Sequence, residues 1–573
     1  MKRMPIGILL LMVVISTASF AKTRNDDAAI PGKDVVLVVN ADIVTMDPGK
    51  PSAEAMAVSG GRILAVGTES EVRKTIGDYT KFYNLEGRTI VPGFIETHDH
   101  LYMSSSQYVV TDVTPFTTPT LAAALDKIRH TQPNEEGWVV GFGADQQLYE
   151  EKRGPSRDLL DEMFPNIPVI VFHLSGHGAF VNSAALRLAG VDETTPDPTG
   201  GYYEKDKEGR LTGYLSGQPA VFSVKAFPNP TPEMARLAAE ARAAKGVTTA
   251  SEFAIMNVFV LEGLQEATRS PTFPVRVVAG LFSTIPDFEE VAPRLKYYEN
   301  DLFRIPFIKT WTDGSIQGGT GHLSEGYHQH DMGGEGATGT QEFFNKQVLR
   351  MYELGLWPAI HANGDGAVDV ALNAIQYARE TLGEKADKDI RPQLIHVQYT
   401  RPGQIERMVE LKAYPTFFTT HVYYYGDIHH ETTLGPERSQ RLSAMADAFS
   451  AGVKPAMHND PPVTPVDPLL NMWIAVNRQS TSGRVLGADQ AITPQQALEA
   501  YTVNAAYQFG MEKDAGSLEA GKFADFVVLD RNPLKVDPDE IRNIHVMATV
   551  RGGLITYSDV PEYDRIKPPG KEN

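Results

Sequence analysis

Two histidines separated by one residue follow an apolar stretch and carry the sharpest chemical signal in the sequence. Residues 92–100 read PGFIETHDH. Positions i and i+2 of an extended segment face the same side, so the imidazoles of His98 and His100 can reach one metal ion, while Asp99 points elsewhere. Because such a pair also occurs among ordinary surface or core histidines, a metal site needs support from other residues.

Three more residues of metal-ligand type also stand at the ends of apolar stretches. His361 lies in IHANGD (360–365) and His396 in LIHVQ (394–398). Each of these two could equally be a hydrogen-bonded core histidine. Asp460 precedes two prolines that stop its strand, and its carboxylate could bind a metal, take a proton from metal-bound water, or cap a helix N-terminus.

Lys309 is unusual because it lies inside the apolar stretch FIKTW (307–311). An unpaired buried ammonium group is costly and tends to lose its charge. A neutral amine can take up carbon dioxide, and the resulting carbamate offers two oxygens that can bridge two divalent ions. The alternative is an ion pair between Lys309 and a neighbouring carboxylate.

The elements that position these residues alternate between apolar strands and amphipathic helices. This alternation predicts parallel βαβ units, and a (β/α)8 TIM-type barrel with its site at the carboxyl ends of the strands is the best solution. A doubly wound sheet is the alternative, but no Gly-x-Gly-x-x-Gly turn opens a βα unit. Strands are expected to end near 96–98, 251–252, 309–311, 360–361, 395–396, 420–421 and 458–460, with helices such as 234–245, 404–412 and 439–450.

Both ends of the mature chain are rich in β-hairpin patterns. Examples are 55–66, with a Gly-Gly turn, and 546–557, with a second one. We therefore expect a small β-sandwich domain built from residues 22–92 and 511–560, a barrel over 93–510, and a tail at 561–573. An insertion after the first barrel strand, at about 101–245, is expected to cover the barrel mouth.

The first 21 residues have the order of an export signal. Lys2 and Arg3 precede an apolar run at 6–15, and small residues follow up to Ala21. We expect residues 1–21 to be a signal peptide, the protein to be periplasmic or secreted, and no membrane association after cleavage. A buried N-terminal helix is the alternative.

The composition excludes several classes of function. The 573 residues include 53 basic and 72 acidic side chains, for a net charge of −19, and no cysteine. Strong acidity argues against a nucleic-acid partner. The lack of cysteine excludes disulfides, a thiolate nucleophile and Cys-ligated metal, so any metal must be held by histidine, carboxylate or a less usual oxygen ligand.

Together, the motifs resemble the amidohydrolase superfamily, and within it the amidohydrolase-3 subgroup of YtcJ-like hydrolases. The resemblance extends from about residue 35 to residue 557. It is carried by IVPGFIE (90–96) with His98 and His100, by Lys309 with DGS (313–315), by HANGD (361–365), by PSRD (155–158), GH (176–177) and VNSAAL (181–186), and by AGSLEAGKFADF (515–526).

This resemblance implies two divalent metal ions, with zinc expected. One ion would take His98, His100 and Asp460, and the other His361 and His396. An N6-carboxylated Lys309 and a hydroxide would bridge them. The hydroxide would attack a carbonyl carbon while Asp460 carries the proton to the leaving nitrogen.

The substrate is less well defined by the sequence. His177, His421 and His458 are expected to line the pocket, with a purely structural role as the alternative. Departures such as HND (458–460), where relatives often carry Gly-Ser-Asp, alter the pocket and not the metal chemistry. We expect a secreted hydrolase of a C–N bond (amide, formamide or cyclic amide) in a small-molecule substrate. The alternatives are a deaminase or esterase on the same fold, or a metal-loaded binding or regulatory protein; a homo-oligomer is compatible with the sequence.

Overall fold

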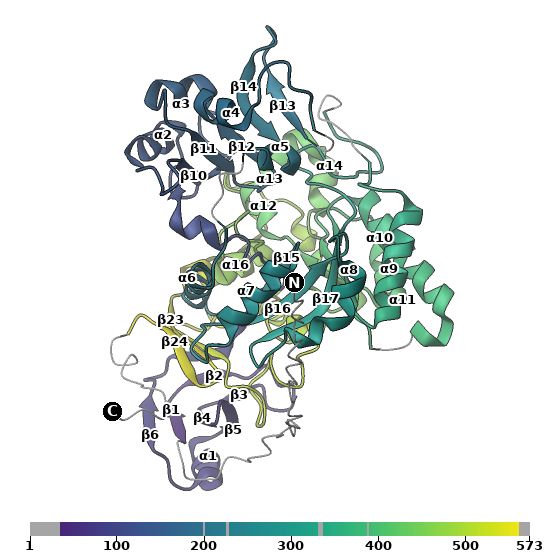
Figure 1. Ribbon diagram of the computed structural model, residues 1–573. Coiled ribbons are helices and arrows are strands. Elements are labelled where there is room, and N and C mark those ends of the chain that lie inside the picture. Colours follow the sequence, from purple (N-terminus) through teal and green to yellow (C-terminus); the bar gives the residue numbers. More distant parts are fainter. Residues whose placement is uncertain (1–34, 199–200, 225–228, 330–335, 387–388, 561–573) are drawn as a thin grey trace, which may run out of the picture.

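The computed structural model describes residues 35–198, 201–224, 229–329, 336–386 and 389–560. The expected signal peptide at 1–21 and the tail at 561–573 lie outside these residues. Figure 1 shows a central α/β body with an inserted sheet at one end and the strands of both chain ends at the other. Within the described ranges, no helix combines the length and the apolar character needed to cross a membrane.

Eight parallel strands form the central sheet, which curls so that its two edge strands meet. Thr97 Oγ1 donates to the carbonyl of Met457 at 3.0 Å, and the N–H of Asn459 donates to Glu96 Oε1 at 2.8 Å. This arrangement fits the expected TIM-type barrel. In order, the strands are β8 (Phe94–Ile95), β15 (Val247–Ile255), β16 (Arg276–Phe282), β17 (Phe303–Trp311), β18 (Trp357–Ala362), β19 (Gln393–His396), β20 (Tyr414–Phe417) and β21 (Ala456–Met457).

Side chains alternate between the inside of the barrel and its helical shell. In β17, Phe307 belongs to the interior cluster, whereas Ile308 packs in the larger cluster shared with the helices. The same period places Lys309 on the inner face, two residues after Phe307. The surrounding helices include α6 (Pro232–Ala243), α7 (Val258–Thr268), α9 (Gln341–Leu354), α10 (Asp365–Leu382), α11 (Pro402–Leu411), α15 (Met445–Ala451), α16 (Pro468–Asn477) and α17 (Pro494–Tyr501).

One expected helix is wrong in its extent. The segment 439–450 was predicted to be a single helix, but it consists of a 3-10 turn at Ser439–Arg441 and then α15. Ser443, between them, has a φ of +47°. A single residue in the left-handed region ends one helical turn and re-aims the chain before the next begins.

Strands from the two chain ends share a six-stranded sheet. The strand β7 (Thr89–Pro92) pairs antiparallel with β22 (Phe526–Leu529), and Gly93 alone separates β7 from the barrel strand β8. A four-stranded sheet packs against this one through a common core that includes Val58, Phe526 and Val550. The other strands of these two sheets are β1 (Val36–Val39), β2 (Asp42–Val44), β3 (Ser52–Ala53), β4 (Ala55–Ser59), β5 (Arg62–Gly67), β6 (Lys81–Asn84), β23 (Val546–Arg551) and β24 (Leu554–Ser558).

A second six-stranded sheet is inserted between β8 and β15 and has its own apolar core. Gln147 Nε2 donates to the carbonyl of Gln317 at 3.0 Å, and the hydroxyl of Tyr425 donates to Asp145 Oδ2 at 3.2 Å, so the insertion is tied to loops at the barrel mouth. Its elements are β9 (Thr111–Asp112), α2 (Leu121–His130), β10 (Val139–Ala144), α3 (Arg157–Met163), β11 (Val169–His173), β12 (Gly178–Val181), α4 (Ser183–Ala189), β13 (Tyr202–Lys205) and β14 (Leu211–Ser216).

Candidate metal centre

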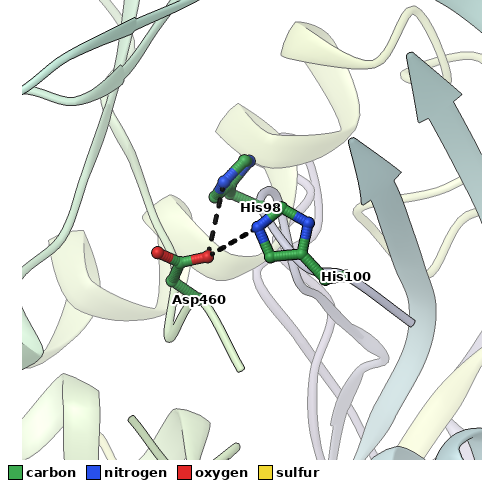
Figure 2. A group of neighbouring side chains, drawn as sticks. All are labelled: His98, His100 and Asp460. Carbon is green, nitrogen blue, oxygen red and sulfur yellow. Dashed lines mark ion pairs between the residues drawn. The ribbon is translucent and has the colours of Figure 1, made fainter. Parts of the chain in front are cut away.

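His98, His100 and Asp460 converge on one point at the carboxyl ends of β8 and β21 (Figure 2). Asp460 Oδ1 lies 3.4 Å from His98 Nε2 and 3.3 Å from His100 Nε2. One ligand atom from each residue falls within 4.8 Å of the others, which is the spacing of donors around a single ion. The sequence analysis placed the two histidines on the strand itself. Because β8 ends at Ile95, they lie just beyond it.

His361 and His396 form a second pair beside this cluster. His396 Nε2 lies 2.9 Å from His361 Nδ1, and His396 Nδ1 lies 3.8 Å from Asp460 Oδ2. The other ring nitrogen of His361 lies 3.0 Å from the carbonyl oxygen of Gly314, a contact that fixes the ring in the way outer partners orient metal-bound histidines. His396 has a φ of +77°, a left-handed conformation that a residue with a side chain rarely adopts.

Lys309 points from β17 into the same space. Its side chain is fully buried, and Nζ has no hydrogen-bond partner among the described residues. Burial lowers the pKa of Lys309 to about 7, and the nearby charge of Asp460 offsets part of this shift. The alternative interpretation of Lys309 was an ion pair with a neighbouring carboxylate. In the described part of the chain, no carboxylate oxygen lies within 4.0 Å of Lys309 Nζ. A neutral amine at this place fits the carbamate expectation.

The donor set fits a divalent metal centre. Besides Lys309 Nζ, several buried side-chain atoms of the proposed ligand residues have no hydrogen-bond partner within the described part of the chain: His98 Nδ1, His100 Nδ1, His396 Nδ1 and Asp460 Oδ1. Buried polar atoms are normally paired, so such a concentration of unpaired ones indicates a missing partner. Imidazole and carboxylate suit zinc, iron, cobalt or manganese.

Buried ion pairs and hydrogen bonds hold these ligands in place, and the sequence analysis missed most of them. Arg242 of α6 makes a two-pronged ion pair with Asp99, whose Oδ1 also accepts the N–H of His100 at 2.7 Å. Glu252 of β15 accepts the backbone N–H groups of residues 102, 103 and 254, and it lies 3.9 Å from His100 Nδ1. The expectation that Asp99 points away from the metal is consistent with this pairing.

The three expected pocket histidines lie in different surroundings. The ring of His458 packs against those of His98 and His396, at centroid distances of 5.2 and 5.1 Å. His421 was expected at the end of a strand, but it lies in the short helix α12 (Thr420–Tyr424). There its Nδ1 lies 3.1 Å from His429 Nε2. His177 comes from the insertion and lines a cavity.

That cavity, of about 890 Å³, lies between the insertion and the loop that follows β17. The rings of His177 and Trp311, which both line it, are in edge-to-face contact, with centroids 6.1 Å apart. The cavity adjoins the metal ligands through His361, because Asp313 and Gly314, which contact that histidine, also line the cavity. A small molecule in the cavity would therefore reach the ligand cluster from the side of β17 and β18.

A curled parallel α/β sheet with histidines, a lysine and an aspartate at its carboxyl ends is the arrangement of metal-dependent hydrolases built on a barrel. The fold resembles that of an uncharacterized metal-dependent hydrolase from Pyrococcus horikoshii, with a TM-score of 0.70 and 24% identity over 88% of this chain and 99% of that one.

Sequence comparison gives the family. The model of the amidohydrolase family matches residues 81–557, and the chain belongs to that family. It is 30% identical to N-substituted formamide deformylase from Arthrobacter pascens over 91% of this chain and 98% of that protein. It is 28% identical to the putative amidohydrolase YtcJ of Bacillus subtilis over 90% of this chain and 98% of that protein. The resemblance proposed from the motifs is thus confirmed.

Proposed function

We propose that the protein is a metal-dependent hydrolase that cleaves a C–N bond of an amide, a formamide or a cyclic amide. The observation that carries the proposal is the convergence of four histidines, Asp460 and the buried, unpartnered amine of Lys309 at the mouth of a barrel. The similarity to a formamide deformylase over almost the whole chain supports the choice of bond.

We further propose that two divalent ions, zinc by preference, occupy this centre. His98, His100 and Asp460 would hold one ion, and His361 and His396 would hold the other. A carboxylated Lys309 would contact both ions. When bound, such ions polarise a carbonyl group and make water a better nucleophile near neutral pH. Lys309 reaches this role only as the neutral amine, which its burial favours.

The protein's own residues would supply the remaining steps. Asp460 lies where its carboxylate can take a proton from the attacking water and pass it to the leaving nitrogen. The Gly314 carbonyl keeps the His361 ring in one orientation. The insertion, which hydrogen-bonds to residues at the barrel mouth, would limit the access of bulk water and so strengthen electrostatic interactions within the site.

Metal analysis combined with turnover assays tests the proposal. Metal-loaded protein should contain about two ions per chain and hydrolyse some members of a panel of N-formyl amines, N-acyl amines and cyclic amides. The His98→Ala variant should lose metal and turnover. His130→Ala, which removes an exposed imidazole of α2 far from the ligands, is the matched control. Metal-loaded protein that turns over only esters or amino-heterocycles would indicate an esterase or deaminase, and one that turns over none of these would indicate a binding protein.

The carboxylation of Lys309 has its own test. Lys309→Ala should lose metal and most activity, and acetate or propionate added with excess metal should restore part of both, because a short acid can supply the two oxygens of the carbamate. Retention of both metals and near-native turnover in this variant would remove Lys309 from the centre.

We also propose that residues 1–21 direct export and that the two sheets from the chain ends form one β-sandwich domain. N-terminal sequencing of exported protein should begin near Lys22. A sequence that still begins at Met1 would contradict the export proposal.

A further inference from the structure

The cavity beside the metal ligands is predominantly acidic. Its lining includes the carboxylates of Asp145, Glu204 and Asp313 and one guanidinium, that of Arg153. Asp313 is engaged by three backbone N–H groups, and Glu204 accepts the hydroxyl of Thr212 at 2.6 Å. Asp145 is as deeply buried as Asp313, at 3% against 2% exposed, and it lies at the junction of the insertion and the barrel.

Asp145 has no cationic partner in the described part of the chain. Its single ion-pair contact within 4.0 Å is His173 Nε2, at 3.8 Å. The N–H of Ser175 donates to His173 Nδ1 at 3.1 Å, so that nitrogen is an acceptor and the imidazole is the neutral tautomer. The remaining contacts of the carboxylate are the hydroxyl of Tyr425 and the N–H of Gln147, both uncharged.

A buried carboxylate with only neutral partners is rare, because burial of an uncompensated charge is costly. The surroundings of Asp145 are suited to a cation. The rings of Phe180 and Tyr214, 4.9 Å apart, also line the cavity, and each lies 6.4 Å from the ring of His173. Aromatic faces beside a carboxylate attract ammonium and guanidinium groups.

We propose that the cavity binds substrates that carry a cationic amine or guanidine, with Asp145 as its ion-pair partner and Phe180 and Tyr214 as its aromatic wall. The inference rests on the proposed function in one respect, namely that the other end of the ligand bears the scissile C–N bond. His361, which adjoins the same cavity, marks the end at which that bond would lie.

Equilibrium binding separates this inference from the proposed catalysis. Phenethylamine and phenethyl alcohol have the same ring and chain, but only the amine is cationic at pH 7. Metal-loaded wild-type protein should bind the amine about tenfold more tightly than the alcohol, at the lower end of the range for a hydrogen bond to a charged group. Asp145→Asn should bring this ratio close to one, because the amide oxygen can still accept the N–H of Gln147 and the amide nitrogen can donate to the hydroxyl of Tyr425, but the charge is lost.

Tyr425→Phe is the matched control, since it removes the hydroxyl contact to Asp145 and leaves the carboxylate. It should keep the preference for the amine. Equal binding of the two probes by wild type, or an unchanged ratio in Asp145→Asn, would overturn the inference. If the probes are discriminated as expected but no amide is hydrolysed, the proposed function fails and the cation site stands.

Discussion

Removal of the positive charge of Arg242 should destabilise the barrel and weaken the metal site at the same time. Arg242 Nε and Nη2 lie 2.9 and 2.7 Å from the two oxygens of Asp99, and both side chains are 0% exposed. Arg242→Met keeps most of the aliphatic stem but leaves the carboxylate of Asp99 buried and unpaired. Breaking a pair of this kind by removing one partner costs about 3–5 kcal/mol.

A double-mutant cycle measures this coupling. Asp99→Asn leaves a buried guanidinium, whereas Asp99→Asn combined with Arg242→Met removes both charges and keeps an acceptor for the N–H of His100. The double variant should therefore be destabilised by much less than the sum of the two single variants. The assay is denaturant unfolding followed by the fluorescence of the barrel tryptophans. Arg294→Met, which breaks the exposed pair with Glu290, is the control and should change little.

Metal content supplies the second measurement. Asp99 fixes the backbone of His100, so loss of Arg242 should lower the number of bound ions per chain, and the double variant should recover part of them. Additive free energies in the cycle would refute the reasoning about the buried charge. Full metal content in Arg242→Met would refute the role of this ion pair in placing His100.

Three further outcomes are expected. Removal of metal with a chelator should lower the free energy of unfolding by about 4 kcal/mol if the free ion was present at a thousand times its dissociation constant. Readdition of the metal should restore this free energy, and unchanged unfolding curves would contradict a resident metal. The His421→Ala variant should lose about 2–4 kcal/mol of folding free energy because the substitution leaves a cavity in the core. It should keep its metal, as elemental analysis would show, because the His421 ring hydrogen-bonds to His429 and not to a proposed metal ligand. Gly93→Ala should lower the thermal midpoint strongly, since its Cβ would lie 2.1 Å from Thr248 Oγ1, and Thr248→Ala in the same chain should restore part of the loss.

The sequence indicated that the proposed ligands would lie close together, because each stands at or near the end of an apolar strand and parallel strands bring their carboxyl ends together. His98, His100 and Asp460 indeed meet although they are far apart in the chain. The same rule failed for His421, because β20 ends at Phe417 and the chain then turns into a short helix. Chain turns after a strand depend on local backbone conformation, which hydrophobic patterning does not encode.

The supporting groups were harder to find. Nothing in the pattern around Arg242 distinguishes it from an exposed helix residue, since its partner Asp99 is brought to it only by the closed barrel. The sequence around Asp145 does not distinguish it either, because the feature that matters is the absence of a cationic side chain near its carboxylate in the described structure. Residues that act through pairing across distant elements become visible only when the fold is known.

The pairing of β7 with β22 has a consequence for how the chain is made. The partner of residues 89–92 lies at 526–529 and is synthesised long after them. Until then, β7 exposes an unpaired apolar edge, which is a template for aggregation. Contacts of such long sequence separation form slowly. We therefore expect the newly made chain to aggregate less when this edge is protected, for example by a holding chaperone, until β22 has been made.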